Sequence, residues 1–323
     1  MAGLLLARHQ LYETITEVIK VNRSYEIITG KIVHQLERGI IPWQCPWFGV
    51  TGPISHLTGR PYSALNTLLL GLDGENVENE EFITWNQIQK YKKQNPAVSI
   101  IRGSKARTIY FWRTFEKTEV NDKGEAIVVK QVPYLRSYNV FRVRDCVGIE
   151  PRWQSKPENQ AKLSPIQQAE DVVQKYLNRE KIALKHDNAN EAFYHKKLDY
   201  INVPPISNFK VCAEDYYGTL LHEMVHSTGA ESRLCRFSCN GSPSPFGSQN
   251  YSREELVAEI GSAFLMNKIG IETKNTFEQS AAYIQGWLRA LQNDKSLIAL
   301  AAGRAEKAVH FILGENVCDD VNE

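Results

Sequence analysis

The spacing of apolar residues along the chain predicts helices near both ends of the sequence. Apolar side chains recur at three- and four-residue intervals through residues 11–38, which favours one amphipathic helical region that ends at Gly39. Two further patterns of the same period lie within residues 277–313, separated by Asn293 and Asp294. We interpret this C-terminal pair as packing helices.

Runs rich in β-branched and aromatic residues predict strands in the N-terminal half. The runs at residues 114–120 and 126–132 flank a turn signal at residues 121–124, which favours a β-hairpin. Further strands are expected at residues 108–112 and 138–143. The N-terminal half is therefore expected to combine a helix with a sheet.

A polar, proline-bearing stretch at residues 151–164 predicts a linker between two domains, residues 1–150 and residues 165–323. The second domain opens on a helix for which Ser164 is the N-cap and Gln167 completes a capping box. Its short strand patterns lie at residues 182–184, 192–194 and 200–203. The prediction is an α+β protein with an N-terminal mixed α/β domain and a C-terminal, mainly helical domain with a small sheet. At 323 residues the chain is long enough for each domain to bury its own core.

Residues 217–229 predict a helix that carries a metal-binding pair. Apolar residues form a stripe at helical spacing, and Gly229 is placed as a stop. His222 and His226 lie one turn apart on one face and can share a metal ion, whereas Glu223 points about a quarter-turn away, which suits a group that acts on water. This H-E-x-x-H pattern is typical of zinc hydrolases, so we predict one Zn²⁺ ion with Glu223 as the catalytic base. The alternative is a core helix with two incidental histidines.

A catalytic zinc ion normally has three protein ligands, so a carboxylate from the next predicted helix is expected to complete the site. Glu255 and Glu259 lie one turn apart on one face of that helix. We assign Glu255 as the third ligand and Glu259 as the carboxylate that orients a ligand histidine. The reverse assignment remains open, because spacing alone cannot order two acids on one face. Ser252 is placed to cap the helix with Glu255 in the capping-box position, so a capping role alone is the alternative for Glu255.

The distribution of charge changes the interpretation of the N-terminal half. The whole chain has a net charge of +1, so no strongly basic surface is expected overall. Residues 82–115, however, contain seven Lys and Arg, interleaved with aromatic residues, and no acidic residue. Basic side chains neutralise phosphates and aromatic rings stack on bases, which predicts binding of single-stranded DNA. The alternative is a solvated basic face on an aromatic-rich sheet.

The candidates for contacts with DNA come from two places. Two are tryptophans on the loop at residues 40–48, which two prolines stiffen, and the others lie in the acid-free window. They are Trp43, Trp47, Lys105, Arg107, Tyr110, Trp112 and Arg113.

Cysteine usage and hydropathy predict a cytoplasmic protein. The six cysteines form no repeated framework, which favours reduced thiols in a reducing compartment. No apolar run reaches membrane-spanning length, and the N-terminal apolar run is too short for a signal peptide. We therefore expect no membrane partner, and no nucleotide cofactor.

Taken together, the chain resembles the ArdC-like antirestriction proteins of mobile elements, which join an N-terminal domain that binds single-stranded DNA to a C-terminal zinc metallopeptidase-like domain. The resemblance implies that His222, Glu223 and His226 are the zinc and catalytic motif. It covers residues 40–47, 103–112, 138–146, 192–205, 217–229, 253–264 and 284–313.

The resemblance implies both binding of single-stranded DNA and zinc-dependent cleavage of a protein substrate. Two alternatives stay open. One is a zinc peptidase whose N-terminal domain selects protein partners. The other is a DNA-coating protein whose zinc site is structural.

Overall fold

The computed structural model describes eight stretches of the chain. They are residues 23–44, 52–120, 126–153, 164–188, 190–209, 212–237, 249–271 and 281–315, with the backbone alone for 114–120, 126–133 and 249–252. Trp47, residues 11–22 of the first predicted helix and residues 154–163 of the predicted linker lie outside this description.

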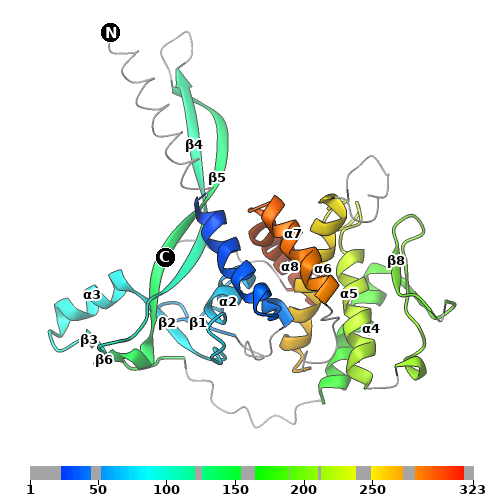
Figure 1. Cartoon of the computed structure of the whole chain (residues 1–323), viewed down its shortest axis with the longest axis horizontal. Coiled ribbons are helices and arrows are strands. Elements are labelled where there is room, and N and C mark those ends of the chain that lie inside the picture. The colour runs from blue at the N-terminus through cyan, green and yellow to red at the C-terminus, as the bar shows by residue number, and fades with distance from the viewer. Residues whose placement is uncertain are drawn as a thin grey trace.

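The N-terminal half is built on a four-stranded sheet in the order β1–β2–β5–β4 (Figure 1). Its strands are β1 (Ile54–Ser55), β2 (Glu81–Thr84), β4 (Arg107–Val120) and β5 (Ala126–Arg142). β1 runs parallel to β2, and the other pairs are antiparallel. The helix at residues 23–37 and α2 (Ala64–Leu70) lie beside the base of the β4–β5 hairpin, whose far end extends away from the body.

A smaller lobe flanks this sheet. It contains α3 (Trp85–Gln94) and a two-stranded sheet of β3 (Ser99–Ile100) and β6 (Cys146–Val147). Short 3-10 turns lie at η1 (Pro42–Gln44), η3 (Val143–Asp145) and η4 (Ile206–Asn208).

The hairpin is longer than the sequence pattern predicts. The predicted strands at 108–112 and 114–120 merge into β4, and those at 126–132 and 138–143 merge into β5. Pro133, which interrupts the pattern, pairs opposite Thr114 inside the ladder. β2 pairs only with the last three residues of β5, so Pro133 lies where β5 has a neighbour on one side, which a proline tolerates.

The C-terminal half is mainly helical, as predicted. Its helices are α4 (Pro165–Glu180), α5 (Ala213–Ser227), α6 (Gln249–Lys268), α7 (Ala281–Asn293) and α8 (Leu297–Leu313), and its small sheet has the order β7 (Ala183–Lys185), β9 (Tyr200–Asn202), β8 (Phe193–His195). The Ser164 capping box with Gln167 is confirmed, because both of its hydrogen bonds form. The predicted cap at Ser252 is wrong, since α6 already begins at Gln249.

The two halves of the chain share one hydrophobic core. α6 packs between α5 and α8, and the core continues to Ile28, Ile32 and Leu36 of the N-terminal helix. The Thr29 hydroxyl also donates a 2.6 Å hydrogen bond to the carbonyl of Lys295, which precedes α8. A smaller second cluster lies between β2, α3 and β6. The expectation of a separate core for each half is therefore replaced by a common core that crosses the predicted boundary.

Within the described stretches, none of the helices is both long and apolar enough to cross a bilayer.

Candidate metal centre

α5 places the two histidines of the motif on its half-exposed side. Its apolar stripe, Leu220, Leu221, Met224 and Val225, is buried in the common core. The side chains of His222 and His226 retain 20% and 12% of their exposure. The helix is thus anchored by its apolar face and offers the imidazoles to the neighbouring helix α6.

A glycine allows α6 to approach α5 closely. A Cβ atom on Gly261 would lie 2.9 Å from a Cγ atom of Val225, closer than side chains tolerate. The close packing of the two helices brings the second turn of α6 over the imidazoles. Because Glu255 lies in that turn, inside the helix, a role in capping alone is excluded.

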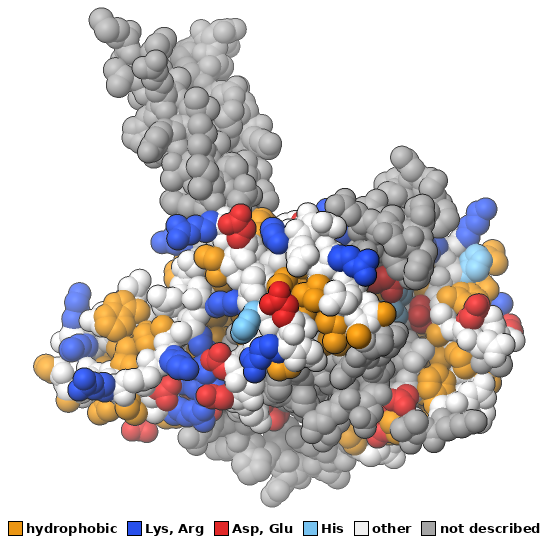
Figure 2. All heavy atoms as spheres, in the orientation of Figure 1, with side chains coloured by type: hydrophobic (Ala, Val, Ile, Leu, Met, Phe, Trp, Pro, Cys, Tyr) orange, Lys and Arg blue, Asp and Glu red, His pale blue; other side chains and the backbone are white. Residues whose placement is uncertain are grey.

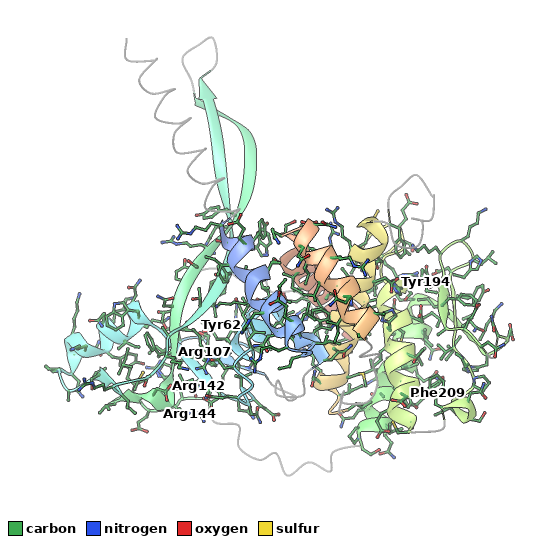
Figure 3. All side chains as sticks on the ribbon, in the orientation of Figure 1. Tyr62, Arg107, Arg142, Arg144, Tyr194 and Phe209 are labelled. Carbon is green, nitrogen blue, oxygen red and sulfur yellow. The ribbon has the colours of Figure 1, made fainter. Side chains whose placement is uncertain are left out.

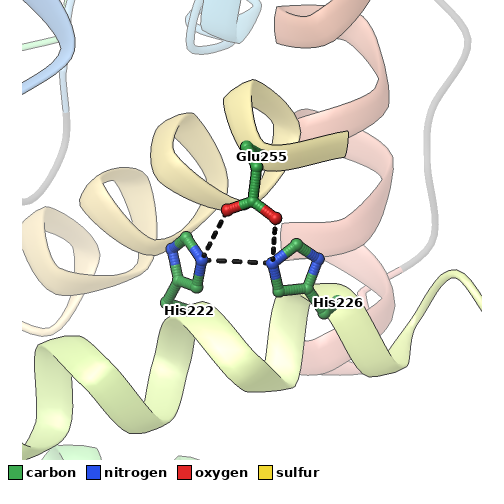
Figure 4. A group of neighbouring side chains, drawn as sticks. All are labelled: His222, His226 and Glu255. Atoms are coloured by element: carbon green, nitrogen blue, oxygen red, sulfur yellow. Dashed lines mark hydrogen bonds and ion pairs between the residues drawn. The ribbon is translucent and has the colours of Figure 1, made fainter. Parts of the chain in front are cut away.

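His222, His226 and Glu255 form a triangle of potential ligands (Figure 4). The two Nε2 atoms are 3.1 Å apart, and the Glu255 carboxylate oxygens lie 3.6 Å from His222 Nε2 and 3.5 Å from His226 Nε2. Ligands in a tetrahedral shell with bonds of about 2.0–2.1 Å are separated by about 3.3 Å. The spacing of these donor atoms therefore fits one small divalent ion.

Electrostatics favours a cation between these side chains. Burial disfavours the charged imidazole of His226, but Glu254 and Glu255, with the charge of Glu223, outweigh it and raise its pKa to about 10. Burial likewise opposes the ionised form of Glu255, yet the two histidines hold its pKa well below the usual range. The carboxylates thus favour a positive charge at this site, whether a proton on His226 or a metal ion carries it.

Glu254 contacts the opposite side of the His226 ring. Its Oε1 lies 3.5 Å from His226 Nδ1, and Arg236 donates to both of its oxygens at 2.7 and 3.2 Å. Arg236 in turn donates to the Val225 carbonyl and the Thr228 hydroxyl. Glu254 therefore occupies the position beside His226 that the sequence prediction gave to Glu259.

Glu259 occupies a different position from the one expected. It is 9% exposed and accepts a 3.2 Å hydrogen bond from the indole N–H of Trp43. Burial raises its pKa, against the opposing effects of His222, Tyr283 and Trp43. Its described hydrogen bonds thus join it to the surroundings of the site rather than to a ligand histidine. Glu223 is also buried, at 8% exposure, on the helix that carries both histidines.

The predicted DNA contacts divide into buried and exposed residues. Trp43 and Tyr110 are only 0% and 3% exposed, so no base can stack on them, and we correct both predictions. Arg107 is engaged in ion pairs with Asp73 and Glu75. Lys105 and Trp112 are exposed and Arg113 is half-buried, and these three stay candidates.

Two residues of β5 that the sequence prediction did not name join these candidates. Arg136 is exposed, and its guanidinium lies 5.3 Å from the centre of the half-buried Tyr138 ring. Arg136 pairs opposite Phe111 and Tyr138 opposite Ile109, so they share a sheet face with Arg113. The signal was present, because residues 126–144 contain no acidic residue either. Figure 2 shows Lys and Arg side chains gathered over the α3 lobe and the base of the hairpin.

Two family models match separate parts of the chain. Residues 22–141 match the family described as the N-terminal domain of anti-restriction factor ArdC, and residues 171–304 match the family described as zincin-like metallopeptidase. DNA primase TraC of Escherichia coli is 30% identical over 306 residues, which are 90% of this chain and 27% of the primase. The chain therefore spans about a quarter of the length of that relative.

Two solved structures are similar over nearly their whole length. The metal-free crystal structure of the antirestriction protein ArdC from plasmid R388 aligns with a TM-score of 0.66 at 30% identity, covering 89% of this chain and 96% of that one. The Mn(II)-bound structure aligns with the same TM-score at 29% identity, covering 90% and 97%. With this coverage and both family matches, the chain belongs to the ArdC family of antirestriction proteins.

Proposed function

We propose that this protein is an antirestriction protein of a mobile element that binds single-stranded DNA and hydrolyses peptide bonds at a single zinc ion. The observation that carries the enzymatic part is the triangle of His222, His226 and Glu255, whose donor atoms are spaced for one ion. The ArdC relative whose structure contains Mn(II) supports a divalent ion at such a centre. Two imidazoles and a carboxylate are a donor set that zinc accepts.

The chemistry divides between the ion and the chain. When bound, the ion supplies a Lewis acid that acidifies water and polarises a carbonyl oxygen. Glu223 is the base: its carboxylate accepts the proton of the attacking water and later delivers it to the leaving amine. Its burial restricts competing solvent at that carboxylate.

Exposure favours a catalytic site over a structural one. Structural zinc sites are closed by four protein ligands, whereas catalytic sites keep a position open. Three ligand candidates are grouped in the described residues, and Glu255 and His222 are 26% and 20% exposed. A reactant therefore has access to the site. β8 packs on α5 and forms one edge of the small sheet, so we expect a peptide to pair with it as a further strand.

Glu223→Gln tests the enzymatic half. We expect this variant to retain zinc, measured by elemental analysis after dialysis, and to lose cleavage of a mixed peptide library read by mass spectrometry. The zinc-loaded wild type and the chelated wild type are the positive and negative controls. Loss of zinc in the variant would contradict its role as the base. Zinc and DNA binding without any cleavage by the wild type would favour the DNA-coating alternative.

The DNA-binding half is supported by the sheet face that carries Arg113, Arg136 and Tyr138. A guanidinium over a tyrosine ring combines a phosphate contact with a stacking surface, which is what sequence-tolerant binding of single strands requires. The ArdC domain match over residues 22–141 covers these strands.

Arg136→Gln and Tyr138→Leu test this surface with a fluorescent oligothymidine in a salt series. Arg136→Gln should weaken binding and reduce the slope of log affinity against log salt by about 0.7, the value for one phosphate contact on a single strand. Loss of a stacked base costs about 1–3 kcal/mol, so Tyr138→Leu should weaken binding about fivefold or more, whereas Tyr138→Phe should not.

Arg304→Gln is the matched control, because Arg304 is an exposed arginine on α8 and not on a strand of the sheet. Equal losses in Arg136→Gln and Arg304→Gln would reject the sheet face. Binding that is absent from the wild type would favour the alternative in which this domain selects protein partners.

A further inference from the structure

Three arginines meet at the foot of the long hairpin (Figure 3). Arg107 begins β4, Arg142 ends β5, and Arg144 follows in the next turn. The side chain of Arg142 is only 2% exposed and that of Arg107 only 10%, whereas Arg144 is 55% exposed. Two guanidinium groups are therefore held at the edge of the sheet with little access to water.

The carboxylate of Glu75 contacts all three arginines. Glu75 accepts a short hydrogen bond from Arg142 Nη1, and its Oε2 lies 3.5 Å from Arg107 Nη2 and 3.6 Å from Arg144 Nη2. The hydrogen bond from Arg142 holds the pKa of Glu75 below its ordinary value. Glu75 is nevertheless 55% exposed, so the carboxylate reaches the arginines from the solvent side.

Two further acids contribute to the cluster. Asp73, which is 52% exposed, lies 3.1 Å from Arg107 Nη2. Glu80 lies 2.9 Å from Arg144 Nη1 and 3.8 Å from Arg142 Nε. Asp73 and Glu75 belong to the exposed loop between α2 and β2, whose Gly74 has a φ of 75°.

The acids leave part of the arginine donors unsatisfied. Among the described residues, the buried Nε of Arg107 and the buried Nε and Nη2 of Arg142 have no hydrogen-bond partner. An unpaired buried donor is unfavourable, and more so on a charged group. A carboxylate has only two oxygens, too few to accept from all the N–H donors of three guanidinium groups. A phosphate offers more acceptor oxygens at the same site.

We propose that Arg107, Arg142 and Arg144 form a binding site for a backbone phosphate of single-stranded DNA, and that Glu75 occupies this site in the free protein. This site rests on the proposed DNA-binding function and adds a phosphate contact to the surface that carries Arg136 and Tyr138. Alternate residues of β5 share a face, so Arg142 lies on the same side of the sheet as Arg136 and Tyr138. Six residues of strand separate Arg136 from Arg142, about 20 Å, and Val140 between them is buried, so the phosphate site is a separate contact at the other end of β5 and not part of one continuous exposed face.

Displacement of Glu75 leaves neither partner uncompensated. Glu75 is 55% exposed, so water solvates its carboxylate on the loop after release. The phosphate takes the place of that carboxylate beside the three guanidinium groups. Glu75 therefore acts as a built-in competitor that lowers affinity for an isolated phosphate.

Inorganic phosphate tests the site without DNA. Phosphate affinity of the full chain is measured by titration calorimetry for the wild type, Glu75→Gln and Glu37→Gln; Glu37 is an exposed glutamate on the N-terminal helix, outside the arginine cluster. We expect Glu75→Gln to bind phosphate at least about threefold more tightly than the wild type does, and Glu37→Gln to bind it as the wild type does. The double variant Glu75→Gln/Arg144→Gln should lose this increase in phosphate affinity. Arg144 is exposed, so its replacement does not depend on a buried position.

Oligothymidine gives the second arm of the test. Glu75→Gln should bind it more tightly than Glu37→Gln does, with a salt slope steeper by up to about 0.7 if one more phosphate contact forms. The proposal is overturned if Glu75→Gln and Glu37→Gln match in both arms, or if Glu75→Gln only lowers the thermal stability, as a purely structural ion pair would. Failure of the wild type to bind oligothymidine would reject the proposed DNA function, while the phosphate arm would still decide the site.

Discussion

Glu254 contacts His226 from the side opposite to the ligand triangle: its Oε1 lies 3.5 Å from Nδ1, whereas Nε2 faces His222 and Glu255. Arg236 fixes the position of this carboxylate through two donors. A carboxylate behind a ligand histidine fixes the orientation and tautomer of the ring and increases its basicity as a ligand.

Glu254→Gln should therefore weaken metal affinity without removing a ligand. The expected loss is about 10- to 100-fold, the usual effect of removing such a partner. Competition with a chromogenic chelator measures it. Glu231→Gln is the control, since Glu231 is an exposed glutamate shortly after α5. Equal affinity of the two variants would show that Glu254 serves only the ion pair with Arg236.

Metal binding should depend on Glu255 and not on Glu259. Only Glu255 places its oxygens within 3.6 Å of both imidazoles, so Glu255→Ala should lose the ion after dialysis. Glu259→Gln should keep it, because burial raises the pKa of this acid and the amide imitates its neutral form. Elemental analysis of the two proteins decides. The opposite result would restore Glu259 as the third ligand.

The motif and its helix were predictable because they depend on local periodicity. His222 and His226 need only one helical turn, and Glu255 follows from the coordination number of zinc. Glu254 was not predictable, because its contact with His226 depends on how α6 crosses α5 and on Arg236 in the loop between them.

The position of Trp43 could not be predicted from the sequence. Its neighbouring prolines and aromatic residues favour a stacking surface, but its ring is fully buried against Trp287, at 5.9 Å and nearly perpendicular. The sequence pattern carries no information about a core that joins residues this far apart. In contrast, the α4 capping box is local, and it was predicted correctly.

Metal affinity should rise with pH. The pKa of His226 is raised to about 10 in the metal-free protein, so this ring is protonated at neutral pH, and a metal ion must displace the proton. Apparent log affinity should increase by about one per pH unit until the ring titrates. Calorimetry in two buffers of different ionisation enthalpy measures the released proton at pH 7, and no release would contradict the prediction.

The metal-free fold should show the corresponding loss of stability at high pH. A histidine with a raised pKa contributes stability that is complete below its unfolded pKa of about 6.5 and is lost as pH rises through the folded value. The free energy of unfolding of the apoprotein should therefore fall as pH approaches about 10. Denaturant titrations at several pH values test this, with the metal-loaded protein as the control.

Trp43→Phe should destabilise the protein through Glu259. The substitution keeps an aromatic ring beside Trp287 but removes the N–H that donates to the buried carboxylate at 3.2 Å. A buried acceptor without its donor costs about 1–3 kcal/mol, and denaturant unfolding of the metal-free protein measures it. Trp85→Phe, at a position 49% exposed, should change stability much less.

A double-mutant cycle identifies the cause. If the lost hydrogen bond is responsible, Trp43→Phe should cost less in a Glu259→Leu background, where no acceptor remains for the indole N–H. Because Trp43 and Glu259 lie in different halves of the chain and share one core, unfolding should also remain a single transition. Additive costs, or two transitions that separate the halves, would show that this contact does not join them.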